Sequence, residues 1–279
     1  MTARVGALWM YPIKGCRGFG VPAATLAATG LEIDGIGDRE WVVVDEQGEF
    51  LSQRELPKMA LIQTRLTGMS LRLKAPGMLQ LEVPFESEGD VVNVRVWNDE
   101  VAAVTQGAIA DAWFSKFLGL QCRLMRFDPE ASRISNPKYT GAFVAPYKFA
   151  DAFALLVCSD ASLADLNSRL AAKGQAAITI ERFRPNIVLD EIDPFEEDYV
   201  DHFTIGAAKL SVVKPCVRCT VPNVDVSTGE ASFEPGDTLA TYRNDARAGG
   251  VTFGVNAVIE TGSGARLAVG DRVDMSLRF

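Results

Sequence analysis

The chain has 279 residues, of which 48% are hydrophobic and 23% are charged. These values are ordinary for a globular protein with room for two domains. A formal net charge of −8 argues against general nucleic-acid binding, which favours a basic surface. The five cysteines suggest no disulfide framework, and no apolar run reaches the roughly 18 residues that a membrane span needs. We therefore expect a protein of the reducing cytoplasm that binds neither nucleic acid nor membrane.

The first half of the chain is predicted to consist mainly of strands. Residues 5–11 and 41–44 are apolar runs, and residues 71–74 and 79–83 alternate as half-buried strands do. Further strands are predicted at residues 25–29, at 61–66, at 91–97 and at 50–53, the last as the hairpin partner of 41–44. Many short strands separated by turns favour a barrel or a sandwich.

A helix and a long connection follow these strands. Apolar side chains at helical spacing predict a helix that begins near Ile109 and ends at Gly119. Residues 122–127 are predicted to form a strand, and the Pro- and Gly-containing stretch 128–150 has no clear periodicity. We place a domain boundary near the start of that stretch, which gives domains at residues 1–125 and 126–279.

The second half also alternates strands with few helices. Ser159 is a plausible N-cap for a helix that Gly174 ends. Strands are predicted at residues 153–158, 178–180, 187–189, 203–205, 208–213, 253–260 and 267–273. The predicted fold class is therefore mainly β with a few helices (α+β), with a β-barrel-like first domain.

A cysteine loop at residues 214–225 is the most informative stretch. It carries Cys216 and Cys219 with Lys214 and Arg218, and a thiol beside a cation ionises more easily. One reading is a buried cysteine pair with incidental charges. Zinc needs four ligands, and the chain adds only His202 and scattered cysteines to this pair. A thioredoxin-like motif needs a helix after the cysteines, which is not predicted, so we infer a single functional thiolate.

Several basic residues fall in turns or at strand ends, where ligand contacts concentrate. They are Lys14, Arg17, Arg39, Arg54, Arg184 and Arg218. In an acidic protein such a set suits a phosphate-bearing ligand, although a solvated charge is the commoner role for any one of them. The acidic run at residues 196–198 is interpreted as a solvated face, and His202 as structural. No P-loop or dinucleotide-binding motif is present in the sequence.

The chain resembles the two-part MOSC proteins, in which an N-terminal MOSC β-barrel domain precedes a MOSC β-barrel domain. The resemblance covers nearly the whole chain and extends to the mitochondrial amidoxime reducing component and its bacterial counterparts. It rests on five motifs: Tyr11-Pro12-Ile13-Lys14 with Cys16 and Gly18; Asp38-Arg39-x-Trp41; residues 159–167; Phe183-Arg184-Pro185-Asn186; and Arg218-Cys219 followed by Val224-Asp225 and Thr228-Gly229.

The resemblance implies a molybdenum cofactor, Mo-molybdopterin, with Cys219 as the catalytic thiolate that binds the metal. The cofactor contacts that it implies are Lys14, Gly15, Arg39, Ala152, Phe153, Arg184, Asn186, Val217, Arg218, Cys219 and Asn256. Residues near Ala152 and Asn256 differ in type from the amidoxime reducers, and Gly15 stands where those relatives often have Ser.

The implied reaction is the two-electron reduction of an N-hydroxylated small molecule. Electrons are expected from a separate donor protein of ferredoxin or flavoprotein type, because the sequence has no cysteine cluster for an iron–sulfur centre. Two alternatives stay open. One is a sulfur carrier with a persulfide on Cys219 or Cys216, and the other is a non-catalytic module that binds the cofactor.

Overall fold

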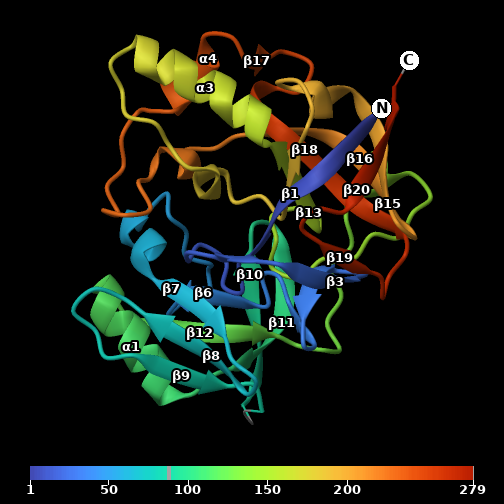
Figure 1. Ribbon diagram of the computed structural model, residues 1–279. Coiled ribbons are helices and arrows are strands. Elements are labelled where there is room, and N and C mark those ends of the chain that lie inside the picture. The colour runs from blue at the N-terminus through green and yellow to red at the C-terminus, as the bar shows by residue number, and fades with distance from the viewer. Residues whose placement is uncertain (87–88, 279) are drawn as a thin grey trace.

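The protein, seen here as a computed structural model that describes residues 1–86 and 89–278, has two β-rich halves. In Figure 1 the upper half contains a closed barrel, and the lower half contains smaller sheets and a helix. The barrel strands, in spatial order, are β13 (Leu155–Ser159), β14 (Ile187–Asp190), β1 (Thr2–Met10), β20 (Arg272–Leu277), β15 (Val200–Ile205), β16 (Ala208–Val217) and β18 (Gly250–Thr261).

The barrel closes because β13 pairs with β14 on one side and with β18 on the other. Two short strands extend it: β2 (Phe19–Val21) pairs with β1, and β17 (Asn244–Asp245) pairs with β18. Alternate residues of the strands fill the interior, among them Leu8, Phe203 and Leu210. Closure removes most of the exposed strand edges and fixes the ends of β14, β16 and β18 relative to one another.

Within the residues that the structure describes, three smaller sheets make up the rest of the β structure. The first contains β10 (Val91–Val96), β11 (Asp99–Thr105), β12 (Cys122–Phe127) and β6 (Trp41–Asp45). The second contains β7 (Gln63–Leu66), β8 (Ser70–Lys74) and β9 (Leu81–Pro84), and the third contains β19 (Arg266–Ala268), β3 (Ala23–Ala27), β4 (Gly30–Ile33) and β5 (Ile36–Gly37).

Strands from each end of the chain cross between the two predicted domains. The N-terminal strand β1, deep blue in Figure 1, lies between β14 and β20 of the barrel. In the other direction, β19 pairs with β3. The boundary at residue 125 therefore stays a prediction, and the two halves are tied together by backbone hydrogen bonds.

Short helices cover the sheets. The α-helices are α1 (Ala108–Leu118), α2 (Pro137–Thr140), α3 (Asp160–Ala172) and α4 (Gly236–Ala240). The 3₁₀ helices are η1 (Pro57–Leu61), η2 (Ile180–Phe183), η3 (Glu196–Tyr199) and η4 (Val221–Asn223). In the described residues, no helix has the length and apolar character to cross a membrane.

The prediction of a mainly β fold with few helices is confirmed. Two predicted helix ends hold: Gly119 caps α1 in the left-handed conformation, and the hydroxyl of Ser159 accepts from the Ser162 amide at the start of α3. The strand expected at residues 178–180 is wrong. There the Asn167 side chain satisfies both backbone groups of Ile178 in place of a neighbouring strand.

Other boundaries differ from the predictions for local reasons. The expected hairpin partner at residues 50–53 makes only one bridge to β6, at Phe50, because the chain turns from Ser52 onward. The expected strand 267–273 is two strands, separated by a turn at Gly270, whose φ is positive. Residues 214–217, assigned to a loop, extend β16 because they pair with β18 across bulges.

The acidic run is not a solvated face, so that prediction is wrong. Glu197 is fully buried at the start of α3. Its carboxylate accepts hydrogen bonds from the hydroxyls of Ser162 at 2.8 Å and Ser159 at 3.1 Å. Asp198 pairs with Arg243. The run therefore supplies buried hydrogen bonds where α3, η3 and β13 meet.

Glu197 makes stability depend on pH. Burial raises the pKa of Glu197 from 4.5 to about 7, and the hydrogen bonds from Ser162 oppose that rise only in part. The folded state then keeps a proton that the unfolded chain has already released. Stability should fall as pH rises from about 4.5 to about 7, by on the order of 3 kcal/mol.

We expect Glu197→Gln to remove this loss, so that its free energy of unfolding, relative to that of the wild type, improves between pH 5 and pH 8. Urea denaturation at several pH values measures the difference. Glu196→Gln, which leaves Glu197 in place, should keep the wild-type slope. Parallel pH profiles for the wild type and Glu197→Gln would contradict the assignment.

Candidate functional site

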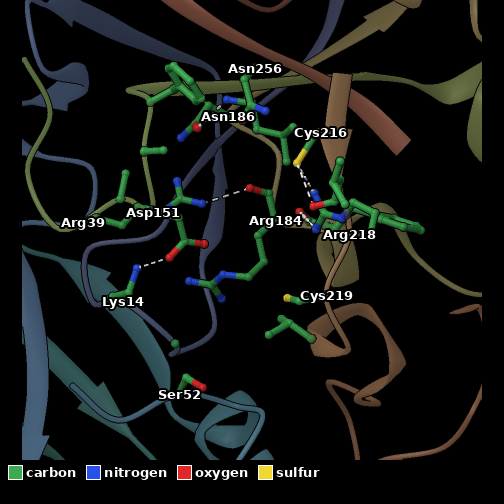
Figure 2. A pocket seen from close by; sticks show the side chains of 18 of the residues that line it. Lys14, Arg39, Ser52, Asp151, Arg184, Asn186, Cys216, Arg218, Cys219 and Asn256 are labelled. Carbon is green, nitrogen blue, oxygen red and sulfur yellow. Dashed lines mark hydrogen bonds and ion pairs between the residues drawn. The ribbon is translucent and has the colours of Figure 1, made fainter. Parts of the chain in front are cut away.

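A pocket lies where the residues just before β14, the end of β16 and the segment before β13 meet loops of the N-terminal half (Figure 2). The structure brings together every residue predicted to hold the cofactor. These are Lys14, Gly15, Arg39, Ala152, Phe153, Arg184, Asn186, Val217, Arg218, Cys219 and Asn256. Because they come from segments far apart in the sequence, only the fold can place them in one pocket.

The extension of β16 carries the cysteines to the pocket. Val217 pairs with Thr252 of β18, and the Arg218 amide donates to the Val251 carbonyl at 2.8 Å. Beyond this point the chain leaves the strand, and Cys219 is exposed. The other cysteine of the loop, Cys216, is partly buried, so Cys219 is the more accessible thiol at the pocket.

Arg218 is held on two sides and has one donor left over. Its Nη1 donates to Cys216 Sγ at 3.0 Å, and its Nη2 donates to the Phe183 carbonyl at 2.8 Å. Its Nε is buried, and no partner for it exists among residues 1–86 and 89–278. An unpaired buried donor is costly, so this nitrogen is suited to a ligand acceptor in the pocket.

Arg39 and Arg184 lie on the ring of Tyr11. Their guanidinium carbons are 4.5 Å and 4.4 Å from the ring centroid. Arg39 Nη2 donates to the Arg184 carbonyl at 3.0 Å, and Arg184 Nη1 donates to the Cys16 carbonyl. Burial, followed by repulsion from Arg39, lowers the pKa of Arg184 to about 10. Asp38 pairs with Arg39, so the two guanidinium groups carry one net positive charge, which favours a further anion beside them.

Both arginines have left-handed backbone conformations, with φ of 50° at Arg39 and 60° at Arg184. Such angles are uncommon for residues other than glycine and cost free energy. At both positions the sharp turn aims the side chain into the pocket. Strain at two facing cationic residues is typical of a functional site.

Lys14 is the most buried cation of the pocket. Its amide donates to the Trp41 carbonyl at 2.8 Å, and its Nζ donates to the Phe149 carbonyl at 2.9 Å and to Asp151. Burial lowers the pKa of Lys14, and Asp151 opposes that effect. The next residue, Gly15, has φ of +83°, and an added Cβ would lie 2.9 Å from the Met59 methyl group. Glycine therefore suits this position sterically.

The uncharged predicted contacts have mainly positional roles. The Asn186 side chain is buried and accepts from the Leu156 amide at 3.2 Å, which ties its turn to β13. Asn256 lies on β18 opposite Lys214. The Ala152 carbonyl accepts from Ser135 at 2.8 Å, whereas Phe153 packs edge-on against Tyr139.

Sequence reasoning missed several lining residues. They include Phe50, Ser52, Gln53, Asp151, Lys214 and Cys216. Lys214 and Cys216 belong to the cysteine loop but are not among the predicted cofactor contacts. No sequence pattern marks Asp151 as a pocket residue. Arg54 was a basic candidate and lines the pocket, whereas Arg17 pairs with Glu181 at 2.9 Å and does not.

The pocket is strongly cationic although the protein is acidic. In the described chain it is lined by six basic residues and one acidic residue, Asp151. No group of three or more His, Cys, Asp and Glu side chains is arranged for a metal ion in that part of the chain. The arrangement suits an anionic organic ligand beside an accessible thiol.

Comparison with known proteins gives two family models. The model described as the MOSC N-terminal beta barrel domain matches residues 2–121, and the MOSC domain matches residues 145–274. Human mitochondrial amidoxime reducing component 2 is 36% identical over 247 residues, which cover 86% of this chain and 72% of that protein. Human mitochondrial amidoxime-reducing component 1 is 35% identical over 246 residues, with coverage of 86% and 72%.

Among solved structures, the YUAD protein from Bacillus subtilis aligns over 98% of this chain and 94% of its own. The sequence identity is 11% and the TM-score is 0.45.

The cysteines should differ in reactivity. Burial raises the pKa of Cys16 to about 12 and also raises the pKa of Cys122 and Cys158, whereas Cys219 is exposed. A chromogenic disulfide reagent should therefore modify Cys219 first in the folded protein and all five thiols after denaturation. Cys219→Ala should remove the fastest phase, and Cys122→Ala should keep it. An unchanged fast phase in Cys219→Ala would show that another thiol is the accessible one.

Proposed function

Because the chain belongs to the family of the mitochondrial amidoxime reducing components, we propose that it is a molybdenum-cofactor-dependent reductase of N-hydroxylated compounds. One observation carries the proposal: the exposed thiol of Cys219 lies in a pocket lined by six basic side chains. The combination matches the two needs of such a cofactor, a soft ligand for the metal and cations for its phosphate.

The residues present fit the cofactor. Arg218 Nε is a buried donor without a partner in the described residues, and Arg39 and Arg184 place two guanidinium groups side by side on Tyr11. Lys14, Arg39, Arg184 and Arg218 would hold the phosphate and the pterin. Cys219 would bind the molybdenum. The small Ala152 side chain leaves room for the ligand.

The cofactor, when bound, supplies two-electron redox chemistry at molybdenum. The protein binds and orients the reactants and supplies a cationic environment. In the proposed reaction an amidoxime takes up two electrons and two protons. Its N–O bond breaks, the oxygen leaves as water, and an amidine remains. The cations of the pocket wall would also orient the cofactor.

We place the electron source in a separate protein of ferredoxin or flavoprotein type. An iron–sulfur cluster is typically held by four thiolates, and three of the five cysteines of this chain, Cys16, Cys122 and Cys158, are buried. Because all five cysteines are free, we also place the protein in a reducing cytoplasm.

A second candidate function uses the same exposed thiol. Cys219 could carry a persulfide and act in sulfur transfer, since an accessible thiol beside a cation is sufficient for that chemistry. Mass spectrometry that finds a labile added sulfur and no molybdenum would favour this function.

Metal analysis tests the proposal directly. Protein from a cofactor-competent host should contain about one molybdenum per chain and reduce benzamidoxime when a donor supplies electrons. Cys219→Ala should lose most of the molybdenum and the activity, because the thiolate ligand is gone. Its pterin content should fall less, since the basic residues remain.

The matched control is Cys122→Ala, which removes a buried thiol outside the pocket. It should keep the wild-type molybdenum content and activity. Full molybdenum content in Cys219→Ala would exclude the ligand role of this residue. Full molybdenum content in the wild type without turnover of any N-hydroxylated compound would point to a cofactor-binding module.

A further inference from the structure

The pocket contains one carboxylate among its cations. In the described residues that line it, Asp151 is acidic, and the basic residues are Lys14, Arg39, Arg54, Arg184, Lys214 and Arg218. Its side chain is 65% exposed, and Figure 2 shows it beside Lys14 with one oxygen turned toward the open middle of the pocket. A carboxylate in this position repels the phosphate that the cations attract, so it calls for a role of its own.

Asp151 is held in place through a single oxygen. Its Oδ1 accepts hydrogen bonds from both Lys14 Nζ and Trp97 Nε1, the latter at 3.0 Å. Lys14 is anchored in turn by the Phe149 carbonyl at 2.9 Å. Within residues 1–86 and 89–278 no group donates to Oδ2. The carboxylate is thus fixed in orientation and keeps one oxygen for a ligand.

Desolvation by the surrounding protein opposes the charge of Asp151. The attraction of Lys14 and the hydrogen bonds from Lys14 and Trp97 outweigh it, so the pKa of Asp151 is lowered. The side chain is therefore ionised at neutral pH and acts as an acceptor, not as a proton donor.

Trp97 reaches Asp151 from the other half of the protein at a conformational cost. It lies in the turn between β10 and β11 with φ of 59°, which is unusual for a bulky residue. The Arg54 guanidinium lies 4.5 Å from its ring, and the Phe50 ring lies 5.0 Å away. The hairpin is thus shaped to bring an indole N–H to the pocket, which supports a functional role for the carboxylate that it orients.

We propose that Asp151 Oδ2 is a recognition site for a planar N–C–N group that presents N–H donors. The inference rests on the proposed function, which offers two sources of this chemistry: the aminopyrimidine edge of the pterin and the amino group of an amidoxime substrate. A charged acceptor gains most from such donors and discriminates against ligands that lack them.

The test compares the wild type with Asp151→Asn, Trp97→Phe and the control Asp165→Asn. The control makes the same chemical change at an ion pair with Arg169 on α3, outside the pocket. Two quantities are measured in protein from a cofactor-competent host. One is the pterin and molybdenum content, and the other is the calorimetric Kd for benzamidoxime and for benzaldoxime, which has hydrogen in place of the amino group.

If the donor edge belongs to the substrate, Asp151→Asn keeps its pterin and molybdenum and binds benzamidoxime roughly tenfold or more weakly. Its Kd for benzaldoxime then changes less than twofold. If the edge belongs to the pterin, the pterin content of Asp151→Asn falls several-fold, whereas that of Asp165→Asn is unchanged. Trp97→Phe should shift the same quantity in the same direction by a smaller factor, since Lys14 still holds the carboxylate.

Pterin content and both Kd values within twofold of the wild type in Asp151→Asn would overturn the inference. An equal loss of affinity for benzaldoxime and benzamidoxime, at unchanged pterin content, would overturn it as well. If Asp151→Asn fails to fold, Trp97→Phe tests the inference in its place, because that variant leaves the Lys14–Asp151 pair intact. If Asp151→Asn shows either effect but the wild type reduces no N-hydroxylated compound, the proposed reaction is refuted and the recognition site is still supported.

Discussion

The site depends on cations that backbone carbonyls from distant segments hold in place, with carboxylate partners for Lys14 and Arg39. Lys14 donates to Phe149, Arg39 donates to Arg184, and Arg184 donates to Cys16. Each of these bonds joins the loops of the N-terminal half to residues that precede or follow the barrel strands. A buried cation without such partners would be expelled or neutralised. The same bonds that join the two halves therefore orient the remaining donors toward a ligand.

This arrangement gives an acidic chain a local site suited to the anionic cofactor that we propose. The net charge of −8 is spread over the whole chain, whereas six basic side chains line one pocket. Burial lowers the pKa of Lys14 and Arg184, which means that both side chains gain from an incoming negative charge. Asp151 offsets part of the positive charge and gives the pocket an acceptor.

Much of the site could be predicted from the sequence because short motifs encode its turns. Arg184 follows η2 and precedes Pro185, and Cys219 follows the strand that the cysteine loop extends. Gly119 and Ser159 also marked their helix ends correctly, since caps depend on local chemistry. These residues carry a signal that needs no knowledge of distant contacts.

The remaining features depend on contacts that no local pattern shows. Asp151 acquires its role from Lys14 and from Trp97, which are 137 and 54 residues away in the sequence. Glu197 resembled a solvated acid because its partners, Ser159 and Ser162, precede it by more than 30 residues. The continuation of β16 through Pro215 was hidden as well, because proline weakens a strand prediction and the bulges on either side of it exist only in the pairing with β18.

We propose that the Cys219 sulfur binds the molybdenum of a cofactor held by the basic pocket. X-ray absorption at the molybdenum edge, measured on the loaded wild type and on Cys219→Ser protein, tests it most directly. If Cys219 is the ligand, the variant should show one sulfur ligand fewer, with the cofactor's own sulfur ligands unchanged. An identical metal–sulfur shell in the two proteins would contradict it.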